Sequence, residues 1–370
     1  MYKDDFHLTS GCYLLNHSVG RALKTGQDDF NAHFFAPWQS TNKEPWQQWL
    51  GTIERFTGAL SELFNSKKEL FCPQVNLSSA LTKILMSHPR FTGAKCRVLM
   101  AQSDFPSMGF AMQKALPDGA QIDYIPRDLD LTDATIWQQH IKPDTDLVFI
   151  SHAYSNTGQQ APVKDIAAYC KRNNTLSLVD VAQSAGVLPL DLSTVGVDFL
   201  IGSSVKWLCS GPGAAYLWVS ESQLGVCQPK DVGWFSHQNP FEFDINHFDY
   251  HSTALRFWGG TPSIAPYVIA GHSIAYFAKL GVAKVRKHNL SLLSQLRESL
   301  SDYMVSPRSE NACSGTAILH FSAAQNAVLD ALVDADISVD ERVYGIRVSP
   351  HIYNDEQDIA RLIEVIKKVL

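Results

Sequence analysis

The segment from residue 176 to residue 220 constrains the fold more than any other part of the chain. It contains three short apolar runs bounded by turn residues, at residues 176–179, 199–201 and 214–219. Runs of this kind are typical of buried β-strands. Asp180 follows the first run directly, and Lys206 follows the second run after a Gly-Ser-Ser turn. Because α/β proteins bind ligands at strand ends, both side chains are candidates for a ligand site.

The flanking sequence alternates between strand-like and helix-like segments. We expect further strands at residues 96–100, 121–125, 146–151 and 316–321. We expect helices at residues 47–64, 132–141, 162–172, 265–279, 281–303 and 355–370. Alternation of this kind predicts an α/β fold with a mostly parallel sheet covered by helices on both faces.

The pairing of Lys206 with Asp180 suggests a particular chemistry. A lysine in an apolar segment is either a surface residue on a loop or a Schiff-base lysine that burial keeps partly uncharged. Enzymes that use pyridoxal phosphate (PLP) need a lysine to hold the aldehyde and a carboxylate to keep the pyridine nitrogen protonated. The upstream aspartate therefore favours PLP, although the spacing alone leaves both interpretations open.

Four motifs occur in order: DVAQSAG at 180–186, VDF at 197–199, SSVK at 203–206 and GPG at 211–213. Together they resemble the cofactor core of fold-type-I PLP enzymes. Within these they resemble the class V aminotransferase group, which includes kynureninases, cysteine desulfurases and isopenicillin N epimerase-like proteins. The resemblance implies the type I PLP-dependent transferase fold, with a large domain whose mostly parallel sheet is flanked by helices and a smaller α+β C-terminal domain. We expect an N-terminal segment near the active site at residues 1–45, a large PLP-binding domain at 46–264 and the small domain at 265–370.

The same resemblance implies roles for the residues around the cofactor. Lys206 is the Schiff-base lysine, and Asp180 is the partner of the pyridine nitrogen. Gln183 matches the position that touches the PLP phenolic oxygen or the lysine in desulfurases, whereas kynureninases usually carry histidine there. Ser203 is a further cofactor-binding candidate. Val205 replaces the histidine of desulfurases and the tyrosine of kynureninases.

Two segments are expected to bind the cofactor phosphate. Hydroxyl residues open a helical pattern at 76–81 (NLSSAL), and helix starts bind anions. By resemblance Ser78 and Ser79 donate to the phosphate, although Ser78 could also be an ordinary N-cap. The segment 255–263 (LRFWGGTPS) resembles the class V RFE-x-GTP motif, in which the threonine reaches the phosphate bound to the other subunit. If this carries over, Thr261 completes the partner's site in a homodimer.

Aromatic and polar residues complete the expected cofactor site. Phe105, in a segment that resembles the FPS motif of kynureninases, is expected to stack on the PLP ring; the alternative is a core phenylalanine. Trp234, in a Gly-Trp segment similar to that of kynureninases, is expected near the cofactor and substrate. One of Tyr154, Ser155 and Asn156 is expected beside the PLP oxygen.

Three residues are candidates for contact with an amino-acid substrate. Arg347 lies in GIRVSPHIYN at 345–354, which resembles the class V strand whose arginine grips the α-carboxylate. A guanidinium suits this task because it is a bidentate fork that stays charged; the alternative is a surface salt bridge. His33 and Asn16 lie in N-terminal segments similar to those of kynureninases and class V enzymes, but packing or surface roles are open for both.

Lys206, Asp180 and Arg347 together indicate an active PLP enzyme rather than a PLP-binding protein without turnover. Kynureninase-like hydrolysis of a Cβ–Cγ bond is the first prediction, and class V aminotransfer or isopenicillin N epimerase-like isomerisation are the alternatives. Cysteine desulfuration is disfavoured because residues 337–354 contain no cysteine. A Rossmann enzyme is disfavoured because no G-x-G-x-x-G turn follows a strand.

Composition limits the partners and the location. The net charge of −6, without runs of like charge, argues against nucleic acid. The seven cysteines show neither CxxC pairs nor metal-ligand spacing, so we predict reduced thiols and no metal. No signal-peptide pattern is present, and no apolar run approaches the roughly 20 residues that cross a bilayer. We therefore predict a cytoplasmic enzyme with a small-molecule substrate and no membrane partner.

Overall fold

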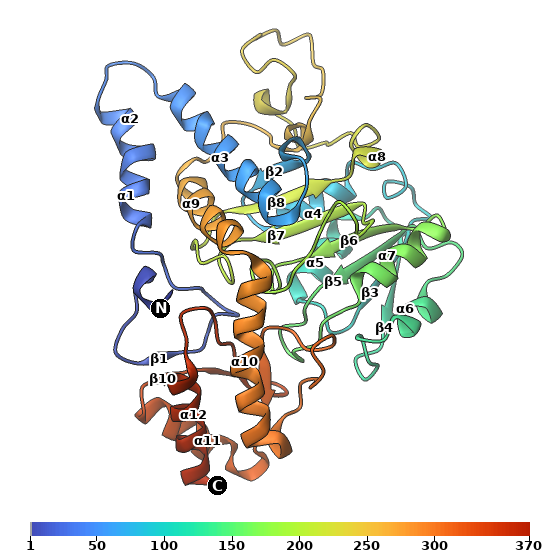
Figure 1. Ribbon diagram of the computed structural model, residues 1–370. Coiled ribbons are helices and arrows are strands. Elements are labelled where there is room, and N and C mark those ends of the chain that lie inside the picture. Colours follow the sequence, from blue (N-terminus) through green and yellow to red (C-terminus); the bar gives the residue numbers. More distant parts are fainter. Residues whose placement is uncertain (1) are drawn as a thin grey trace.

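A seven-stranded sheet forms the centre of the computed structural model, which describes residues 2–370 (Figure 1). The strand order is β2 (Phe71–Gln74), β8 (Ala215–Val219), β7 (Phe199–Ser203), β6 (Leu176–Asp180), β5 (Leu147–Ser151), β3 (Arg97–Ala101) and β4 (Gln121–Ile125). Neighbouring strands from β7 to β4 are parallel, and β8 runs antiparallel to β7 and β2. The prediction of a mostly parallel sheet is therefore confirmed.

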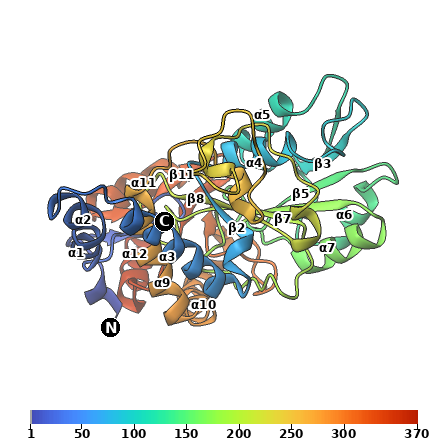
Figure 2. The ribbon, with the colours of Figure 1, turned by 90° about the horizontal axis from the view of Figure 1, so that it is seen from above.

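Helices cover both faces of this sheet (Figure 2). One face packs against α3 (Trp46–Phe64), α6 (Ala134–His140), α7 (Val163–Arg172) and α9 (Ala265–Leu280), and the other against α4 (Leu77–Leu85) and α5 (Pro106–Ala115). Every residue of β5 and β6 is consequently buried. Burial on both faces explains why these strands read as continuous apolar runs rather than as alternating patterns.

A smaller antiparallel sheet lies in the C-terminal part of the chain, with β12 (Gly345–Val348) between β11 (Asp340–Arg342) and β9 (Ala317–Leu319). It shares a separate core with α10 (Val282–Leu300), α11 (Gln325–Asp334) and α12 (Glu356–Val369). The N-terminal strand β1 (Cys12–Tyr13) joins this part by parallel pairing with β10 (Ile337–Ser338). Because α9 packs into the core of the large sheet, we propose that the two parts divide within α10 rather than at residue 265.

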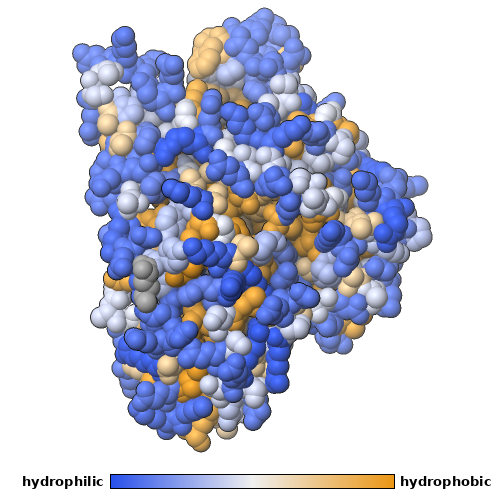
Figure 3. Space-filling view, viewed as in Figure 1, coloured by the Kyte–Doolittle hydropathy of each residue, from blue (hydrophilic) through white to orange (hydrophobic). Residues whose placement is uncertain are grey.

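Two segments project from the body at the top of Figure 1. One is an arm formed by α1 (Gly26–Phe30), the π-helical turn η2 (Asn31–Phe35) and α2 (Ala36–Gln39); the other is the loop at residues 237–250. The arm exposes Trp38, and the loop exposes Phe243 and Ile245. Figure 3 shows apolar surface at the top of the molecule, over this loop.

The remaining elements are short. They are η1 (Tyr2–Asp5), η3 (Lys68–Leu70), α8 (Glu221–Leu224), η4 (Trp234–Ser236), η5 (Ala254–Phe257), η6 (Ser301–Tyr303) and η7 (Ser322–Ala324). Within residues 2–370, no helix combines the length and the apolar character that crossing a membrane would require.

Candidate active site

A cavity of about 230 Å³ lies at the carboxyl ends of β3, β5, β6 and β7. The chain passes from β3 outward to β4 and then returns to β5 on the other side of β3, so the strand order reverses here. Ligands of open α/β sheets bind at such a reversal. Asp180, Ser203 and Lys206 all lie in the cavity wall, so the residues singled out in the sequence share one site.

Lys206 follows β7 and extends toward Phe105, with Nζ 5.9 Å from the centre of the aromatic ring. Burial lowers the pKa of Lys206, and the charge of Asp180 offsets part of this effect. The uncharged amine is therefore more available here than on a surface lysine. The loop that carries Lys206 also contacts the N-terminal part of the chain. The N–H of Gly20 donates to the carbonyl oxygen of Val205 at 2.9 Å.

Replacing Gly20 with alanine should disturb this loop. A Cβ atom at Gly20 would overlap the carbonyl oxygen of Lys206 and lie 2.5 Å from Sγ of Cys209. We expect Gly20→Ala to lower the free energy of unfolding by about 1–3 kcal/mol. Denaturant unfolding measures this loss against Gly58→Ala, whose Cβ meets open space on α3. Equal unfolding midpoints for Gly20→Ala and the parent chain would contradict the close contact.

Asp180 ends β6 with its side chain buried. Its Oδ1 accepts the N–H of Ala182 at 2.7 Å. Burial raises the pKa of Asp180, whereas this hydrogen bond and the charge of Lys206 lower it in part. A positively charged ligand group beside the carboxylate would keep it ionised.

Asp104 is a second carboxyl group beside the site, half-buried, which the sequence reasoning missed. Its Oδ1 accepts the hydroxyl of Ser151 at 2.7 Å, and its Oδ2 accepts the N–H of Ala101 at 2.8 Å. Burial, with a contribution from Asp180, raises the pKa of Asp104 to about 7. The available signal was an acidic residue directly before Phe105 at a strand end.

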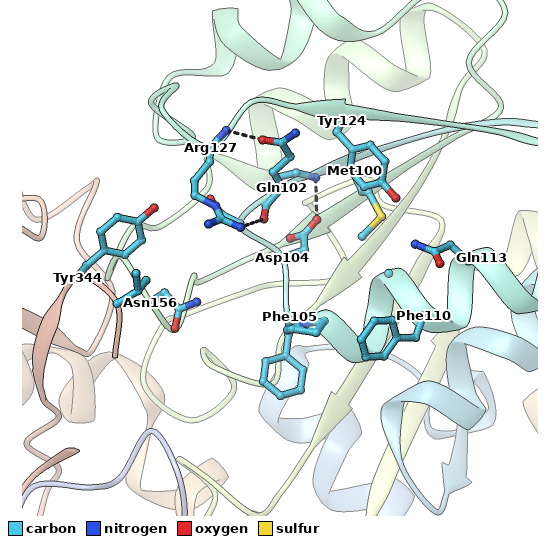
Figure 4. Close-up of a pocket in the computed structure, with 15 residues that line it drawn as sticks. Met100, Gln102, Asp104, Phe105, Phe110, Gln113, Tyr124, Arg127, Asn156 and Tyr344 are labelled. Carbon is cyan, nitrogen blue, oxygen red and sulfur yellow. Dashed lines mark hydrogen bonds between the residues drawn. The ribbon is translucent and has the colours of Figure 1, made fainter. Parts of the chain in front are cut away.

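Phe105 separates the cavity from a neighbouring cleft of about 260 Å³ that also contains Gln102, Arg127 and Tyr344 (Figure 4). Figure 4 shows Phe105 and Asp104 on different sides of the chain. Phe105 is 54% exposed, so the alternative interpretation of a core phenylalanine is wrong. The ring is therefore available for stacking.

Two polar groups in the cavity wall lack partners. The hydroxyl groups of Ser103 and Tyr154 are buried, and neither forms a hydrogen bond within residues 2–370. Leaving such a group unpaired costs about 1–3 kcal/mol. The cavity is thus built for a polar ligand that supplies the missing hydrogen bonds.

Helix α4 begins differently from the prediction. Its N-cap is Asn76, whose Oδ1 accepts the N–H of Ser79 at 2.8 Å, so the alternative of Ser78 as N-cap is wrong. Ser78 lies in the cavity wall beside Asn76 and Leu77, whereas Ser79 does not line the cavity. The asparagine captures the helix N–H that could otherwise serve an anion, which leaves Ser78 as the better placed serine.

The other expected cofactor contacts divide between the cavity and the cleft. Gln183 lies in the cavity wall and donates from Nε2 to the carbonyl oxygen of His17 at 3.0 Å. Tyr154 and Ser155 line the cavity, but Asn156 lines the cleft beyond Phe105. Of the three candidates for the PLP oxygen, Tyr154 and Ser155 are therefore favoured by position.

Besides Ser79, Asn156 and Arg347, four further expected residues do not line the cavity of their own chain. Asn16 is buried outside the cavity wall and accepts the hydroxyl of Tyr353 at 2.6 Å. His33 lies in the arm, with Nδ1 2.9 Å from the carbonyl oxygen of Asp29, and the single chain gives it no pocket role either.

The other two of these residues are Trp234 and Thr261. The indole of Trp234 packs against Trp46 and Phe235. Thr261 is exposed, in a turn that follows Gly259 and Gly260. Neither residue contacts the cavity within one chain, so their expected roles depend on a second subunit.

Arg347 lies on β12, almost fully buried, and its guanidinium is paired with the carboxylate of Asp340. Nε donates to Oδ1 at 2.8 Å, and Nη2 donates to Oδ2. Nη1 lies 3.4 Å from the carbonyl oxygen of Ser155, which lines the cavity. The salt bridge of the alternative interpretation is thus present, with the guanidinium buried, the Asp340 side chain 32% exposed, and the pair next to the cavity wall.

The chain belongs to the class V aminotransferase family, whose profile matches residues 74–362. A kynureninase from Shouchella clausii is 26% identical and matches 100% of this chain and 91% of its own length. The uncharacterized aminotransferase YcbU of Bacillus subtilis is 25% identical over 95% of this chain and 90% of that protein. An isopenicillin N epimerase from Amycolatopsis lactamdurans is 30% identical over 61% of both chains.

Solved structures share the fold. The apo cysteine desulfurase of Thermococcus onnurineus superposes with a TM-score of 0.88 at 18% identity, covering 99% of this chain and 96% of that one. The cysteine desulfurase CsdA of Escherichia coli gives a TM-score of 0.85 at 15% identity, with 100% and 97% coverage. The type I PLP-dependent fold is thus confirmed, and the family makes this protein a PLP-dependent enzyme.

Proposed function

We propose that PLP binds in the cavity with its aldehyde carbon at Lys206 and its pyridine nitrogen beside Asp180. The unpaired hydroxyl groups of Ser103 and Tyr154 support this fit, because PLP carries polar substituents that can complete their hydrogen bonds. Phe105 offers a ring face above the lysine. When bound, PLP supplies an electron sink for negative charge at the substrate α-carbon.

The start of α4 suits the phosphate group. Ser78 lies in the cavity wall at the second position of this helix, where free N–H groups and the helix dipole favour an anion. Gln183 and Ser203 border the cofactor from the ends of β6 and β7.

A homodimer would complete the site. Thr261 is exposed in its own chain, as expected of a residue that reaches a partner's phosphate, and Trp234 lies beside the projecting loop. The exposed apolar side chains of the arm and of the loop at residues 237–250 supply surface for such an interface.

An α-amino acid is the substrate class that the site supports best. The observation that carries this proposal is that Arg347 and Lys206 border one cavity, the first through Ser155 and the second in the wall itself. Arg347 would hold the α-carboxylate, since a guanidinium is a charged fork. Lys206 would then act as general base toward the α-proton, a task suited to an amine whose pKa is lowered by burial.

Kynureninase-like hydrolysis is our first assignment for the reaction. Water adds its hydroxyl to the side-chain carbonyl carbon of L-kynurenine, the Cβ–Cγ bond breaks and Cβ gains a proton, which gives anthranilate and L-alanine. Kynureninases matched along the whole chain support this assignment. All seven cysteines are buried, which disfavours a desulfurase with a cysteine nucleophile.

Aminotransfer and epimerisation remain the competing assignments. Gln183 and Val205 stand where kynureninases usually carry histidine and tyrosine, and both replacements favour a different reaction on the same frame. Neither side chain can exchange a proton near neutral pH.

The products formed from defined substrates decide the reaction. We expect the PLP-loaded protein to convert L-kynurenine to equal amounts of anthranilate and L-alanine, measured by chromatography. Conversion of the cofactor to its aminated form, with a keto acid released from another amino acid, would instead identify an aminotransferase. Inversion at the α-carbon without other products would identify an isomerase.

A further inference from the structure

The substrate-side arginine carries an internal counter-ion. Asp340 on β11 lies directly opposite Arg347 on β12 in the antiparallel pairing, so the two side chains are cross-strand neighbours. The carboxylate accepts from Nε and Nη2 of the guanidinium, which is one complete edge of the fork. Asp340 could therefore be a competitor that a substrate must displace, or a residue that sets the orientation of Arg347.

The surroundings of Asp340 favour the second interpretation. Its Oδ1 also accepts from Nε2 of His17 at 2.9 Å, and His17 is fully buried. Nδ1 of His17 lies 2.7 Å from the hydroxyl of Ser349, which in turn lies 2.7 Å from the hydroxyl of Thr316. A carboxylate tied to both a guanidinium and a buried, anchored imidazole is not free to move away.

The protonation states agree with this geometry. Burial lowers the pKa of His17, although the hydrogen bond to Asp340 opposes this shift. A neutral His17 donates from Nε2 to Asp340 and accepts at Nδ1 from Ser349. Burial alone would raise the pKa of Asp340, but the hydrogen bonds from His17 and Arg347 hold it well below its usual range. Asp340 thus stays ionised at neutral pH.

One edge of the guanidinium remains for a ligand. A guanidinium has five N–H donors, and Asp340 uses only the Nε hydrogen and one Nη2 hydrogen. The Nη1 group points toward the carbonyl oxygen of Ser155, 3.4 Å away, and Ser155 lines the cavity that contains Lys206. The Nη1–Nη2 edge therefore lies beside a residue of the cavity wall.

We propose that Asp340 and His17 are positioning residues that lock Arg347 with its Nη1–Nη2 edge toward the cofactor, where it receives the substrate carboxylate end-on. This inference rests on the proposed role of Arg347 as the carboxylate anchor. The pair also cancels the arginine charge, so recognition depends on the geometry of two parallel N–H bonds rather than on net attraction. A ligand without an α-carboxylate gains nothing from this arrangement.

The test compares two amines on the PLP-loaded protein by absorption titration. L-Alanine carries the α-carboxylate, and ethylamine is the same molecule without it. We expect Asp340→Asn to weaken L-alanine binding at least tenfold and to leave ethylamine binding unchanged, because the amide cannot accept on both sides of the fork. Tighter binding of L-alanine by Asp340→Asn would overturn the proposal and make Asp340 a competitor.

A second pair of variants tests His17 should Asp340→Asn fail to fold. His17→Phe removes the donor to Asp340, whereas His17→Gln can restore it. We expect the phenylalanine variant to lose affinity for L-alanine and the glutamine variant to recover most of it, with equal ethylamine binding in both. Equal L-alanine binding in both variants would contradict the positioning role.

Arg347→Lys separates this inference from the proposed function. If it leaves the preference for L-alanine over ethylamine unchanged, Arg347 is not the carboxylate anchor and the proposed function fails. If it removes the preference while Asp340→Asn changes nothing, the anchor stands and the positioning role fails. The visible band of bound PLP in each variant shows that the cofactor site is intact.

Discussion

Lys206→Ala should remove the visible absorption of lysine-bound PLP and reduce turnover by about a thousandfold or more. Within residues 2–370, Lys206 is the one lysine in the cavity wall. In the proposed mechanism, its loss removes both the amine that holds the cofactor aldehyde and the base that moves the α-proton. Absorption spectra of the purified variant with added PLP, together with initial rates of product formation, measure the two effects separately.

Lys114→Ala is the matched control for this prediction. Lys114 is exposed near the end of α5, so its removal should leave both the spectrum and the rate unchanged. The cofactor-free Lys206→Ala protein should unfold at no lower temperature than the parent, because burial disfavours the charged form of Lys206. A Lys206→Ala variant that keeps the visible band would contradict the proposal that Lys206 binds the PLP aldehyde.

The sequence predicts the sheet and its ligand edge because both depend on local patterns. Apolar runs bounded by turns define strands, and parallel strands place their carboxyl ends together. Asp180 and Lys206 therefore share a cavity in the structure, as their positions at the end of β6 and after β7 predict. Phe105 reaches the same cavity from β3, two strands away from β6.

Long-range pairing explains what the sequence did not reveal. The partner of Arg347 is Asp340, which becomes its neighbour only through a short hairpin that the apolar pattern does not mark. His17 reaches the same carboxylate because β1 joins the C-terminal part of the chain. The contact between His17 and Asp340 joins residues more than 300 positions apart, so sequence spacing could not predict it.

Local competition explains other differences. The predicted phosphate serines were chosen for their hydroxyl groups, but Asn76 is also a strong N-cap and takes the helix N–H at Ser79. Asn16 was expected near the pocket because its segment resembles a class V segment, yet in the interior its oxygen accepts the hydroxyl of Tyr353. Polarity marks a side chain that needs a partner, and it does not tell whether that partner is a ligand or the protein.

Asp180→Asn should reduce turnover by about 100- to 1,000-fold. The carboxylate would no longer stabilise a protonated pyridine nitrogen, so the cofactor would withdraw charge less effectively from the α-carbon. Initial rates at saturating PLP measure this loss. Asp118→Asn, at an exposed turn after α5, should retain the parent rate. A turnover loss below about threefold in Asp180→Asn would contradict the assigned partner of the pyridine nitrogen.

Although Asp180→Asn lowers turnover, it should not lower the stability of the cofactor-free protein. Burial raises the native-state pKa of Asp180 above its unfolded value of about 3.9. The native state then binds the proton more tightly, so this group makes stability fall as pH rises from about 4 through the native pKa. Asp180→Asn removes that loss, and thermal unfolding at neutral pH should occur at the same temperature as the parent or higher.

Asp198 provides a comparison for this combination of lost turnover and retained stability. The carboxylate of Asp198 is half-buried just before β7, and burial raises its pKa as well, but it accepts the N–H and the hydroxyl of Ser177 and the amide of Gln223. Asp198→Asn should lower the free energy of unfolding by about 1–3 kcal/mol and leave turnover of the folded fraction near the parent value. An aspartate retained at a cost to stability, with one internal N–H partner, serves a ligand; an aspartate with three internal partners serves the fold.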